Sequence, residues 1–134
     1  MWWEINQHKS DSRGSLAVVE NRKDLPFDIK RAFYIKSVPK GATRGHHAHI
    51  KTKQVLMVIQ GSCIIELSDG TNNYTYNLNK PHAAVYQKEL VWGHMHSFTT
   101  DCILLVFADT LYDANDYIHD YEVFVEYAGK NVRP

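Results

Sequence analysis

The sequence has few cysteines, no net charge and no long apolar run. Its two cysteines, Cys63 and Cys102, are too few for a disulfide scaffold and lack C-x-x-C spacing, so we expect buried thiols. Fifteen basic side chains balance fifteen acidic ones, and this composition does not indicate binding to nucleic acid or to an acidic membrane. The longest apolar run, residues 102–108, is far too short to span a bilayer.

Signals that would divide or target the chain are also missing. No basic stretch followed by an apolar run opens the sequence, so no signal peptide is visible. We find no internal repeat, low-complexity tract or linker. The sequence therefore predicts one domain over residues 1–134, located in the cytoplasm, with no membrane segment.

Short extended segments follow one another at close spacing, with turn residues between them. About eight such candidate strands indicate a β-sandwich or barrel. They cover residues 16–19, 29–38, 55–59, 63–67, 74–78, 83–86, 90–92 and 98–108. Only the C-terminal part differs: Tyr117, Tyr121, Phe124 and Ala128 recur at helical spacing, which predicts an amphipathic helix over residues 116–128.

A pair of histidines gives the first indication of chemistry. His47 and His49 are two residues apart in an extended segment, so their side chains should project side by side from one face. The spacing Gly41-x5-His47-x-His49-x4-Gln54-x6-Gly61 resembles the first motif of the cupin superfamily, a double-sheet β-barrel. Cupins usually have an acidic metal ligand where this chain has Gln54. A neutral amide brings no charge to offset a cation.

The third histidine of a cupin metal site comes from a later strand, and here both His94 and His96 lie near the expected place. We expect no metal, and a metal-dependent cupin enzyme is the alternative. Without a metal, two neutral imidazoles with ordinary pKa values near 6.5 suit proton transfer.

Other polar residues near this motif are candidates for binding. Arg44 could offer a planar fork to phosphate or carboxylate, or could form only a surface ion pair. Tyr34 could donate a hydrogen bond to a reacting oxygen, or could be an ordinary half-buried strand tyrosine. Lys30 and Arg31 precede it and would add positive charge.

A longer pattern is more specific than the two histidines. The segment Arg44-Gly45-x-His47-Ala48-His49, with Gln54-Val55-Leu56 after it, resembles the nucleotide-sugar 3,4-ketoisomerases, which act on dTDP-4-keto-6-deoxyglucose. Further matches run along most of the chain. They are Asp11-Ser12-Arg13-Gly14-Ser15-Leu16, Pro26-Phe27, Ile29-Lys30-Arg31, Tyr34, Gly61-Ser62, Asp69-Gly70, Val91-Trp92, Met95-His96, Asp116-Tyr117-Ile118, Tyr121 and Phe124.

The resemblance implies a cupin-type double-sheet β-barrel (jelly roll) that forms a homodimer and uses no metal or other cofactor. It also implies an isomerase that moves the ketone of dTDP-4-keto-6-deoxy-D-glucose from C4 to C3 through an enediol. His47 and His49 would be the acid/base pair, with His49 as the base at C3, and Tyr34 would stabilise the oxygen on which charge develops. Substrate-binding roles would fall on Arg44, Gln54, Arg13, Lys30, Arg31, Trp92 and His96.

Two positions depart from the family pattern. Ile50 stands where a lysine is usual, and Gly93 follows Trp92 where the family often has a histidine. Gly93 would adjoin the sugar, so it bears on the configuration at C4 of the product. Arg13 fits the branch that forms the galacto product, which we therefore expect over the gluco product. The second alternative is a non-catalytic nucleotide-sugar-binding module, in which Tyr34, Trp92 and Arg44 bind but no reaction follows.

Overall fold

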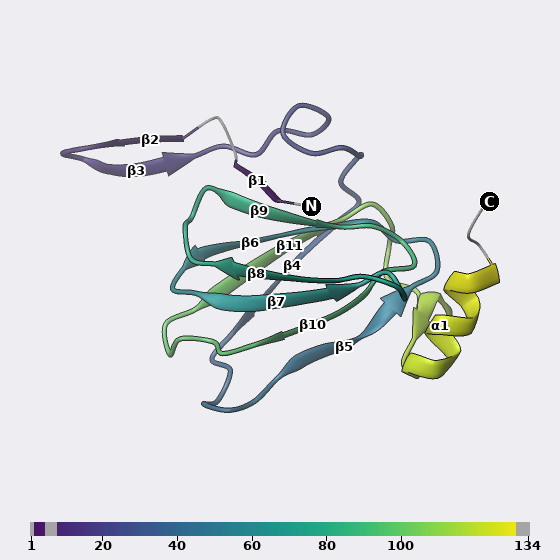
Figure 1. Cartoon of the computed structure of the whole chain (residues 1–134). Helices are drawn as coiled ribbons and strands as arrows, with labels where there is room; N and C mark the ends of the chain where they lie inside the picture. The colour runs from purple at the N-terminus through teal and green to yellow at the C-terminus, as the bar shows by residue number, and fades with distance from the viewer. Residues whose placement is uncertain (1, 5–7, 131–134) are drawn as a thin grey trace.

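Two five-stranded antiparallel sheets pack face to face in the computed structural model, which describes residues 2–4 and 8–130 (Figure 1). The first sheet has the strand order β1 (Trp2–Glu4), β9 (Ala83–Gln87), β6 (Gln54–Gln60), β11 (Ile103–Ala108) and β4 (Arg31–Lys36). The second has the order β12 (Tyr117–Ile118), β5 (Arg44–His49), β10 (Trp92–His96), β7 (Cys63–Ser68) and β8 (Asn73–Leu78). The predicted double-sheet jelly roll is confirmed.

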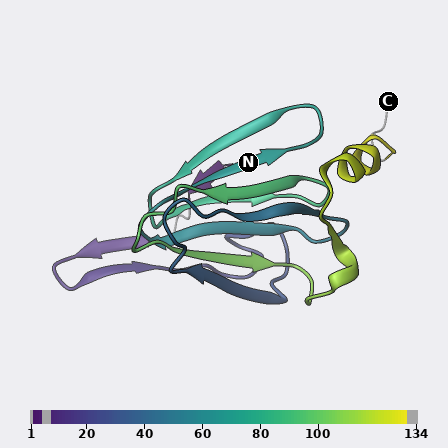
Figure 2. The ribbon, with the colours of Figure 1, turned by 90° about the horizontal axis from the view of Figure 1, so that it is seen from below.

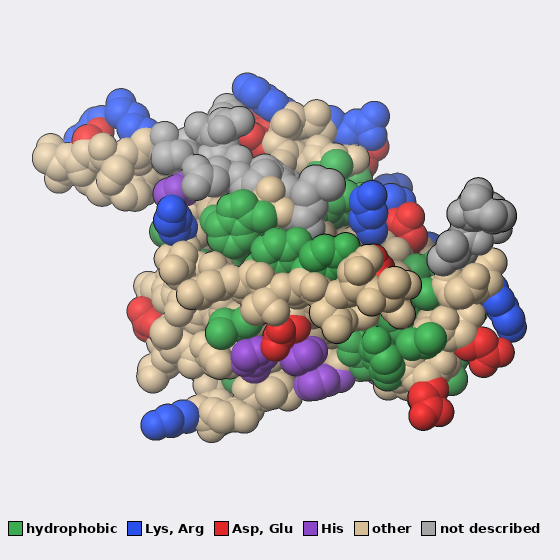
Figure 3. Space-filling model, viewed as in Figure 1, with side chains coloured by type: hydrophobic (Ala, Val, Ile, Leu, Met, Phe, Trp, Pro, Cys, Tyr) green, Lys and Arg blue, Asp and Glu red, His purple; other side chains and the backbone are tan. Residues whose placement is uncertain are grey.

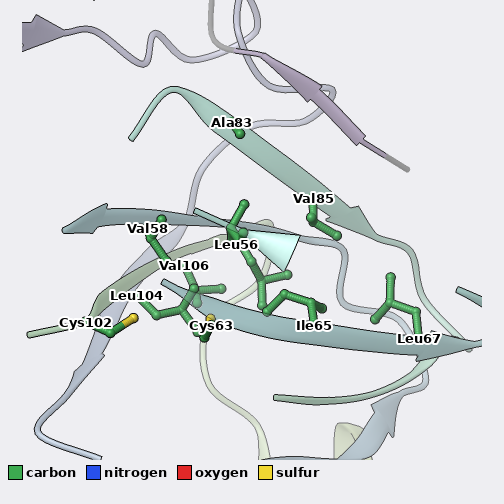
Figure 4. Packing of buried hydrophobic residues seen from close by; sticks show 11 residues of the cluster. Leu56, Val58, Cys63, Ile65, Leu67, Ala83, Val85, Cys102, Leu104 and Val106 are labelled. Atoms are coloured by element: carbon green, nitrogen blue, oxygen red, sulfur yellow. The ribbon is translucent and has the colours of Figure 1, made fainter. Parts of the chain in front are cut away.

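The main core fills one half of the space between the sheets. Strands β6, β7, β9 and β11 point alternate apolar side chains toward each other, as strands of packed sheets do. Figure 4 shows these side chains from close by. The cluster consists of Leu56, Val58, Cys63, Ile65, Leu67, Leu78, Ala83, Val85, Cys102, Leu104 and Val106. Both cysteines are buried free thiols, as the sequence predicts.

Strand β6 is buried on both faces, which explains its unbroken apolar sequence. Its second face lies under the connection between β3 and β4, from which Leu25 and Phe27 pack on Val55 and Met57. On the second sheet, the C-terminal helix α1 (Tyr121–Lys130) covers the outer face of β5 through Phe124.

A two-stranded hairpin, β2 (His8–Asp11) and β3 (Gly14–Ala17), projects from the barrel, and two views at right angles show this (Figures 1 and 2). All four residues of β3 are exposed. Residues 12 and 13 form the tip of this hairpin, where the Arg13 N–H donates to Asp11 Oδ1 at 2.8 Å.

The helix begins later than its periodicity predicts. Residues Ala114–Asp116 form one 3₁₀ turn and Tyr117–Ile118 pair with β5, so the predicted helical start at residue 116 is wrong. The side chain of Asp116 accepts hydrogen bonds from the loop after β5, which removes it from a helix. Asp120 caps the actual helix, because its Oδ1 accepts from the N–H groups of Glu122 and Val123 at 2.9 and 3.1 Å.

Two predicted strands are shifted. The segment predicted at residues 90–92 begins only at Trp92 and extends to His96, since Leu90 has a left-handed φ of 57°, outside the range of a regular strand. The strand predicted at 98–108 begins at Ile103, after a turn closed by the Cys102 N–H and the Thr99 carbonyl at 3.0 Å. No helix of the described residues is long and apolar enough to cross a membrane.

Candidate active site

A cavity of about 310 Å³ opens between the two sheets, in the half that the main core leaves unfilled. This volume is within the usual range for a site that binds a small molecule. Its wall comes from both sheets and from the segment before α1. The lining residues are Phe33, Ile35, Arg44, Gly45, His47, His49, Gln54, Leu56, Gln87, Gly93, Met95, Val106, Tyr112, Ala114, Tyr117 and His119.

A β-bulge in β5 brings Arg44 to the same side as the two histidines. Gly93 on β10 pairs with His47, but the next residue, His94, pairs with Gly45, so His46 is an extra residue in β5. Because side chains alternate along a strand, Arg44 would otherwise point away from the face that carries His47. The bulge reverses this parity, and Arg44 and His47 both line the cavity.

Gly45 is required at the bulge for two reasons. Its φ of 91° is a backbone conformation that residues with a side chain rarely adopt. A Cβ atom at this position would also lie 3.0 Å from the Gly93 carbonyl oxygen and from the His94 Cα. His46 follows with a φ of 64°, and its ring stacks on that of His94 outside the cavity.

His49 is held from behind by a buried carboxylate. Its Nδ1 lies 3.0 Å from Asp116 Oδ2, and both side chains are almost fully buried. Asp116 also accepts from the Lys51 N–H at 2.7 Å and from the Thr52 hydroxyl. Burial alone would raise the pKa of Asp116, but these hydrogen bonds outweigh it and hold that pKa below its ordinary value. An ionised Asp116 fixes the proton of His49 on Nδ1, which leaves the lone pair on Nε2.

His47 and His49 are both neutral near pH 7. Burial lowers the pKa of His49, and the Asp116 carboxylate offsets part of this effect. Burial, with the neighbouring His49 as the second cause, lowers the pKa of His47 to about 4. The two rings meet edge to face at 5.0 Å between centroids. Tyr117 lies beside both, 4.4 Å from the ring of His49 and 4.9 Å from that of His47.

Two buried amides form the opposite wall. Gln54 and Gln87 are paired across β6 and β9, and each is 5% exposed. The Gln87 Nε2 donates to the Val91 carbonyl at 2.9 Å. Gly93 leaves room for this amide, because a Cβ at Gly93 would lie 2.7 Å from the Gln87 Nε2.

Arg31 lies near the rim of the cavity, although it does not line it. Its guanidinium is 5.6 Å from the ring centroid of Phe33 and 5.8 Å from that of Tyr112, and both aromatic residues line the wall. Its Nε is buried and has no hydrogen-bond partner within the described part of the chain. The charge of Arg31 also contributes to the lowered pKa of His49. A buried donor of this kind is suited to an anionic ligand group.

The structure thus brings together four of the predicted site residues, His47, His49, Arg44 and Gln54, with Arg31 close by. Tyr34 is outside, because Phe33 and Ile35 face the cavity and strand alternation directs Tyr34 away; it is 63% exposed on edge strand β4. Lys30 is exposed beside the same strand.

The other predicted binding residues also lie away from the cavity of their own chain. Trp92 and His96 share the outer face of β10, since the inward positions are Gly93 and Met95. The ring of Trp92 packs on Tyr121 and Phe124 of α1, at 5.2 and 5.8 Å between centroids. Arg13 is at the hairpin tip, 3.1 Å from Asp11.

The sequence predicted no functional role for several residues in or beside the cavity. Asp116 and Tyr117 belong to the longer pattern given above, but their helical spacing with later residues predicted a helix at this point. The structure instead pairs this segment with β5. Gln87, Tyr112 and His119 had no signal that separates them from ordinary surface or core residues. His119 stacks on Tyr117 at 5.6 Å between ring centroids.

The cavity does not offer the ligand set of a metal-dependent cupin. Its inward-facing donors on β5 and β6 are two imidazoles and one neutral amide, and β10 adds no histidine because His94 and His96 point outward. Among the described residues, the group of three potential ligands that could hold a metal lies elsewhere, at Glu66, His94 and His96. His119 also lines the cavity, but the group of described residues that could together hold a metal includes none of the cavity histidines, and we assign no reaction step to a metal.

Comparisons with known proteins give a consistent result. A protein-family profile described as FdtA: WxcM-like, C-terminal, matches residues 1–129. A TDP-4-oxo-6-deoxy-alpha-D-glucose-3,4-oxoisomerase from Aneurinibacillus thermoaerophilus is 42% identical over 120 residues, which cover 90% of this chain and 86% of that protein.

Solved structures match over almost the full length. A 3,4-ketoisomerase from Helicobacter canadensis is 39% identical, with a TM-score of 0.89 over 96% of this chain and 97% of that one. A mutant of the 3,4-ketoisomerase QdtA from Thermoanaerobacterium thermosaccharolyticum, in complex with TDP-4-keto-6-deoxyglucose, is 37% identical, with a TM-score of 0.94 over 100% of this chain and 96% of that one.

Proposed function

The chain belongs to the FdtA family, and on this basis we propose that it is a TDP-sugar 3,4-ketoisomerase that converts TDP-4-keto-6-deoxyglucose to a 3-keto isomer. The observation that carries the proposal is the buried His49–Asp116 pair, which presents a neutral imidazole to a cavity of suitable size. An α-proton of a ketone can be removed by such a base.

His49 removes the proton from C3 of the sugar. The electrons of the C3–H bond form a C3–C4 double bond, and the C4 carbonyl oxygen takes the negative charge of an enediolate. His49 then carries a positive charge, which Asp116 stabilises from 3.0 Å. A proton then returns to C4 instead of C3, so the C3–C4 double bond is lost and the carbonyl group forms at C3.

The hydroxyl proton on O3 must also move to O4, because the product has its ketone at C3. His47 lies beside His49 on the same wall and is neutral, so it can accept a proton from O3 and return it to O4. Tyr117 is next to both rings, so it limits how far either imidazole can turn. The net reaction transfers one proton between carbons and one between oxygens, with no change in composition.

Positive charge for the diphosphate comes from the cavity mouth. Arg44 lines the wall on the histidine side, and the buried Nε of Arg31 has no partner among the described residues. Guanidinium groups bind phosphate oxygens through paired N–H donors. Gln54 and Gln87 present amides to the sugar hydroxyls from the opposite wall.

The homodimer predicted from the sequence is also part of the proposal. The projecting hairpin supports it, since strand β3 is exposed along its length and Leu16 is 63% exposed. A two-stranded ribbon of this size is marginally stable alone, and packing on a second copy would stabilise it. Arg13 and Tyr34 would then act on the substrate of the partner copy. Leu16→Glu should shift the chain from dimer to monomer in sedimentation velocity.

Ketone migration tests the proposed reaction directly. The chain is incubated with TDP-4-keto-6-deoxyglucose in D₂O and followed by NMR. We expect the 3-keto product, with deuterium at C4 where the base exchanges with solvent. His49→Asn should abolish product formation and keep the circular dichroism spectrum, and His82→Asn, outside the cavity, should leave turnover unchanged. If the wild-type chain binds the sugar but yields neither product nor label, it is a binding module.

The same reaction run in H₂O, where C4 keeps a proton, assigns the configuration at C4. In the expected galacto product H4 is equatorial and couples weakly to H5, whereas in the gluco product the two protons are trans-diaxial and couple strongly. The galacto product stays a prediction from the sequence.

A further inference from the structure

We propose that the outer face of the second sheet carries a Zn²⁺ site formed by Glu66, His94 and His96. One potential ligand atom from each side chain lies within 4.8 Å of the other two. The site is separate from the cavity, because the adjacent residues of β10, Gly93 and Met95, point inward on the other side of the same sheet. Figure 3 shows a group of histidine side chains with an acidic side chain among them on this face.

The pairing of β10 with β7 brings Glu66, His94 and His96 together. His94 and His96 are two residues apart on β10, so they share a face. Glu66 on β7 is the direct antiparallel partner of His94 and the diagonal neighbour of His96. The three side chains therefore come from two paired strands and not from loops, which favours a defined ligand geometry over an accidental surface contact.

The distances are close to those of a metal site. The His96 Nε2 is 2.8 Å and the His94 Nε2 is 4.0 Å from the same carboxylate oxygen, Glu66 Oε2. In a tetrahedral zinc site with bonds of about 2.0–2.2 Å, two ligand atoms are about 3.3–3.6 Å apart. The two imidazoles offer nitrogen atoms within 4.8 Å of each other, so side-chain movements of about 1 Å would let one ion bind all three atoms.

Each ligand is oriented by a second hydrogen bond or ring contact, as metal ligands usually are. The Thr75 hydroxyl donates to Glu66 Oε1 at 2.6 Å, which leaves Oε2 for the ion. Ser97 Oγ is 2.8 Å from the His96 Nδ1, which leaves Nε2. The ring of His46 stacks on His94 at 4.8 Å between centroids and 10° between planes, so it fixes the plane of that ring.

The donor set indicates the class of metal. Two imidazoles and one carboxylate suit a divalent first-row transition ion such as Zn²⁺, whereas Ca²⁺ and Mg²⁺ need more oxygen ligands. The side chains are 28–36% exposed, so the fourth position of the ion faces solvent. The bound ion would connect β7 with β10 and leave one site for water or for a ligand from another molecule.

Metal binding to the full chain tests the site. The protein is treated with EDTA, desalted, and equilibrated with ZnCl₂ by dialysis, and bound zinc is measured by mass spectrometry. We expect one Zn²⁺ per chain and a higher thermal unfolding midpoint in its presence. The double variant His94→Asn/His96→Asn should lose both effects.

Milder variants separate a metal site from a loss of structure. Glu66→Gln keeps the shape of the ligand, and Thr75→Val removes only its supporting hydrogen bond; each should weaken zinc binding by about 10–100-fold or more. His82→Asn is the matched control and should bind like the wild type. His47→Asn should also bind zinc fully.

Two results would overturn the proposal. One is the absence of saturable zinc binding by the wild-type chain at millimolar ZnCl₂. The other is zinc binding that His47→Asn removes and the double variant keeps, because the ion would then lie in the cavity. The outcome is independent of ketone migration, which uses residues on the opposite face of the sheet.

Discussion

Replacing Asp116 by asparagine tests whether this carboxylate sets the tautomer of His49. In the wild type, Asp116 accepts from the His49 Nδ1, the Lys51 N–H and the Thr52 hydroxyl. Asparagine has one acceptor oxygen, which can keep the Lys51 bond, and its NH₂ group then faces Thr52 and His49. Because an NH₂ group cannot accept the Nδ1 proton, His49 should change to the tautomer with its proton on Nε2.

That tautomer cannot take a proton from the substrate through the atom that faces the cavity. The kcat should fall by about 10²–10⁴-fold, the usual contribution of a general base, with a much smaller change in KM. Hydrogen bonds to a charged group contribute about 1.5–3 kcal/mol each, so the free energy of unfolding should fall by a similar amount. This difference from wild type is full above pH 3.8 and shrinks below it, because the folded chain holds the pKa of Asp116 under that value.

Kinetics of ketone migration and long-range ¹H–¹⁵N spectra of the imidazole nitrogens measure the two effects. Asp113→Asn is the control, since it removes the same charge from a residue that caps the 3₁₀ turn and does not contact His49. A kcat near that of the wild type in Asp116→Asn, or an unchanged His49 tautomer, would refute the reasoning.

Three further predictions follow from the cavity. Gly93→Ala should lower the free energy of unfolding in urea by about 0.5–1.5 kcal/mol, since its Cβ would displace the Gln87 amide from its hydrogen bond; equal stability would show that the wall repacks freely. The kcat/KM should fall in acid with a midpoint below pH 6.5, because burial lowers the pKa of the base, His49; a midpoint above pH 6.5 would contradict this. The wild-type chain should lose stability between pH 6.5 and 4, because the unfolded chain binds a proton at His47 there and the folded chain does not. His47→Asn should make that loss smaller, and an identical pH dependence would argue against it.

The barrel could be predicted from the sequence because its strands alternate or run apolar in the ordinary way. Phe33 and Ile35 face inward as their spacing indicates, and β6 is buried on both faces as its composition indicates. The same alternation, applied strictly, would have placed Tyr34 outside the cavity, although the family pattern assigned it a catalytic role.

The cavity was only partly predictable, since it depends on contacts between distant segments. The pairing of Tyr117 with His49 brings Asp116 behind the imidazole, and a separation of 67 positions along the chain gives no local signal of this contact. The helical spacing of residues 117–128 suggested a different structure there. Tertiary pairing with β5 overrides this local periodicity.

The bulge at Gly45–His46 has a consequence for how the gene can change. A substitution at Gly45 that flattened the bulge, with every residue kept, would restore strict alternation in β5 and turn Arg44 to the outer face, while His47 and His49 keep their side. Such a substitution would separate the anion-binding residue from the imidazole pair without altering either residue type. Related chains should therefore either keep a glycine at the position of Gly45 or lack the extra residue at His46, because Arg44 and His47 would then lie two residues apart on one face.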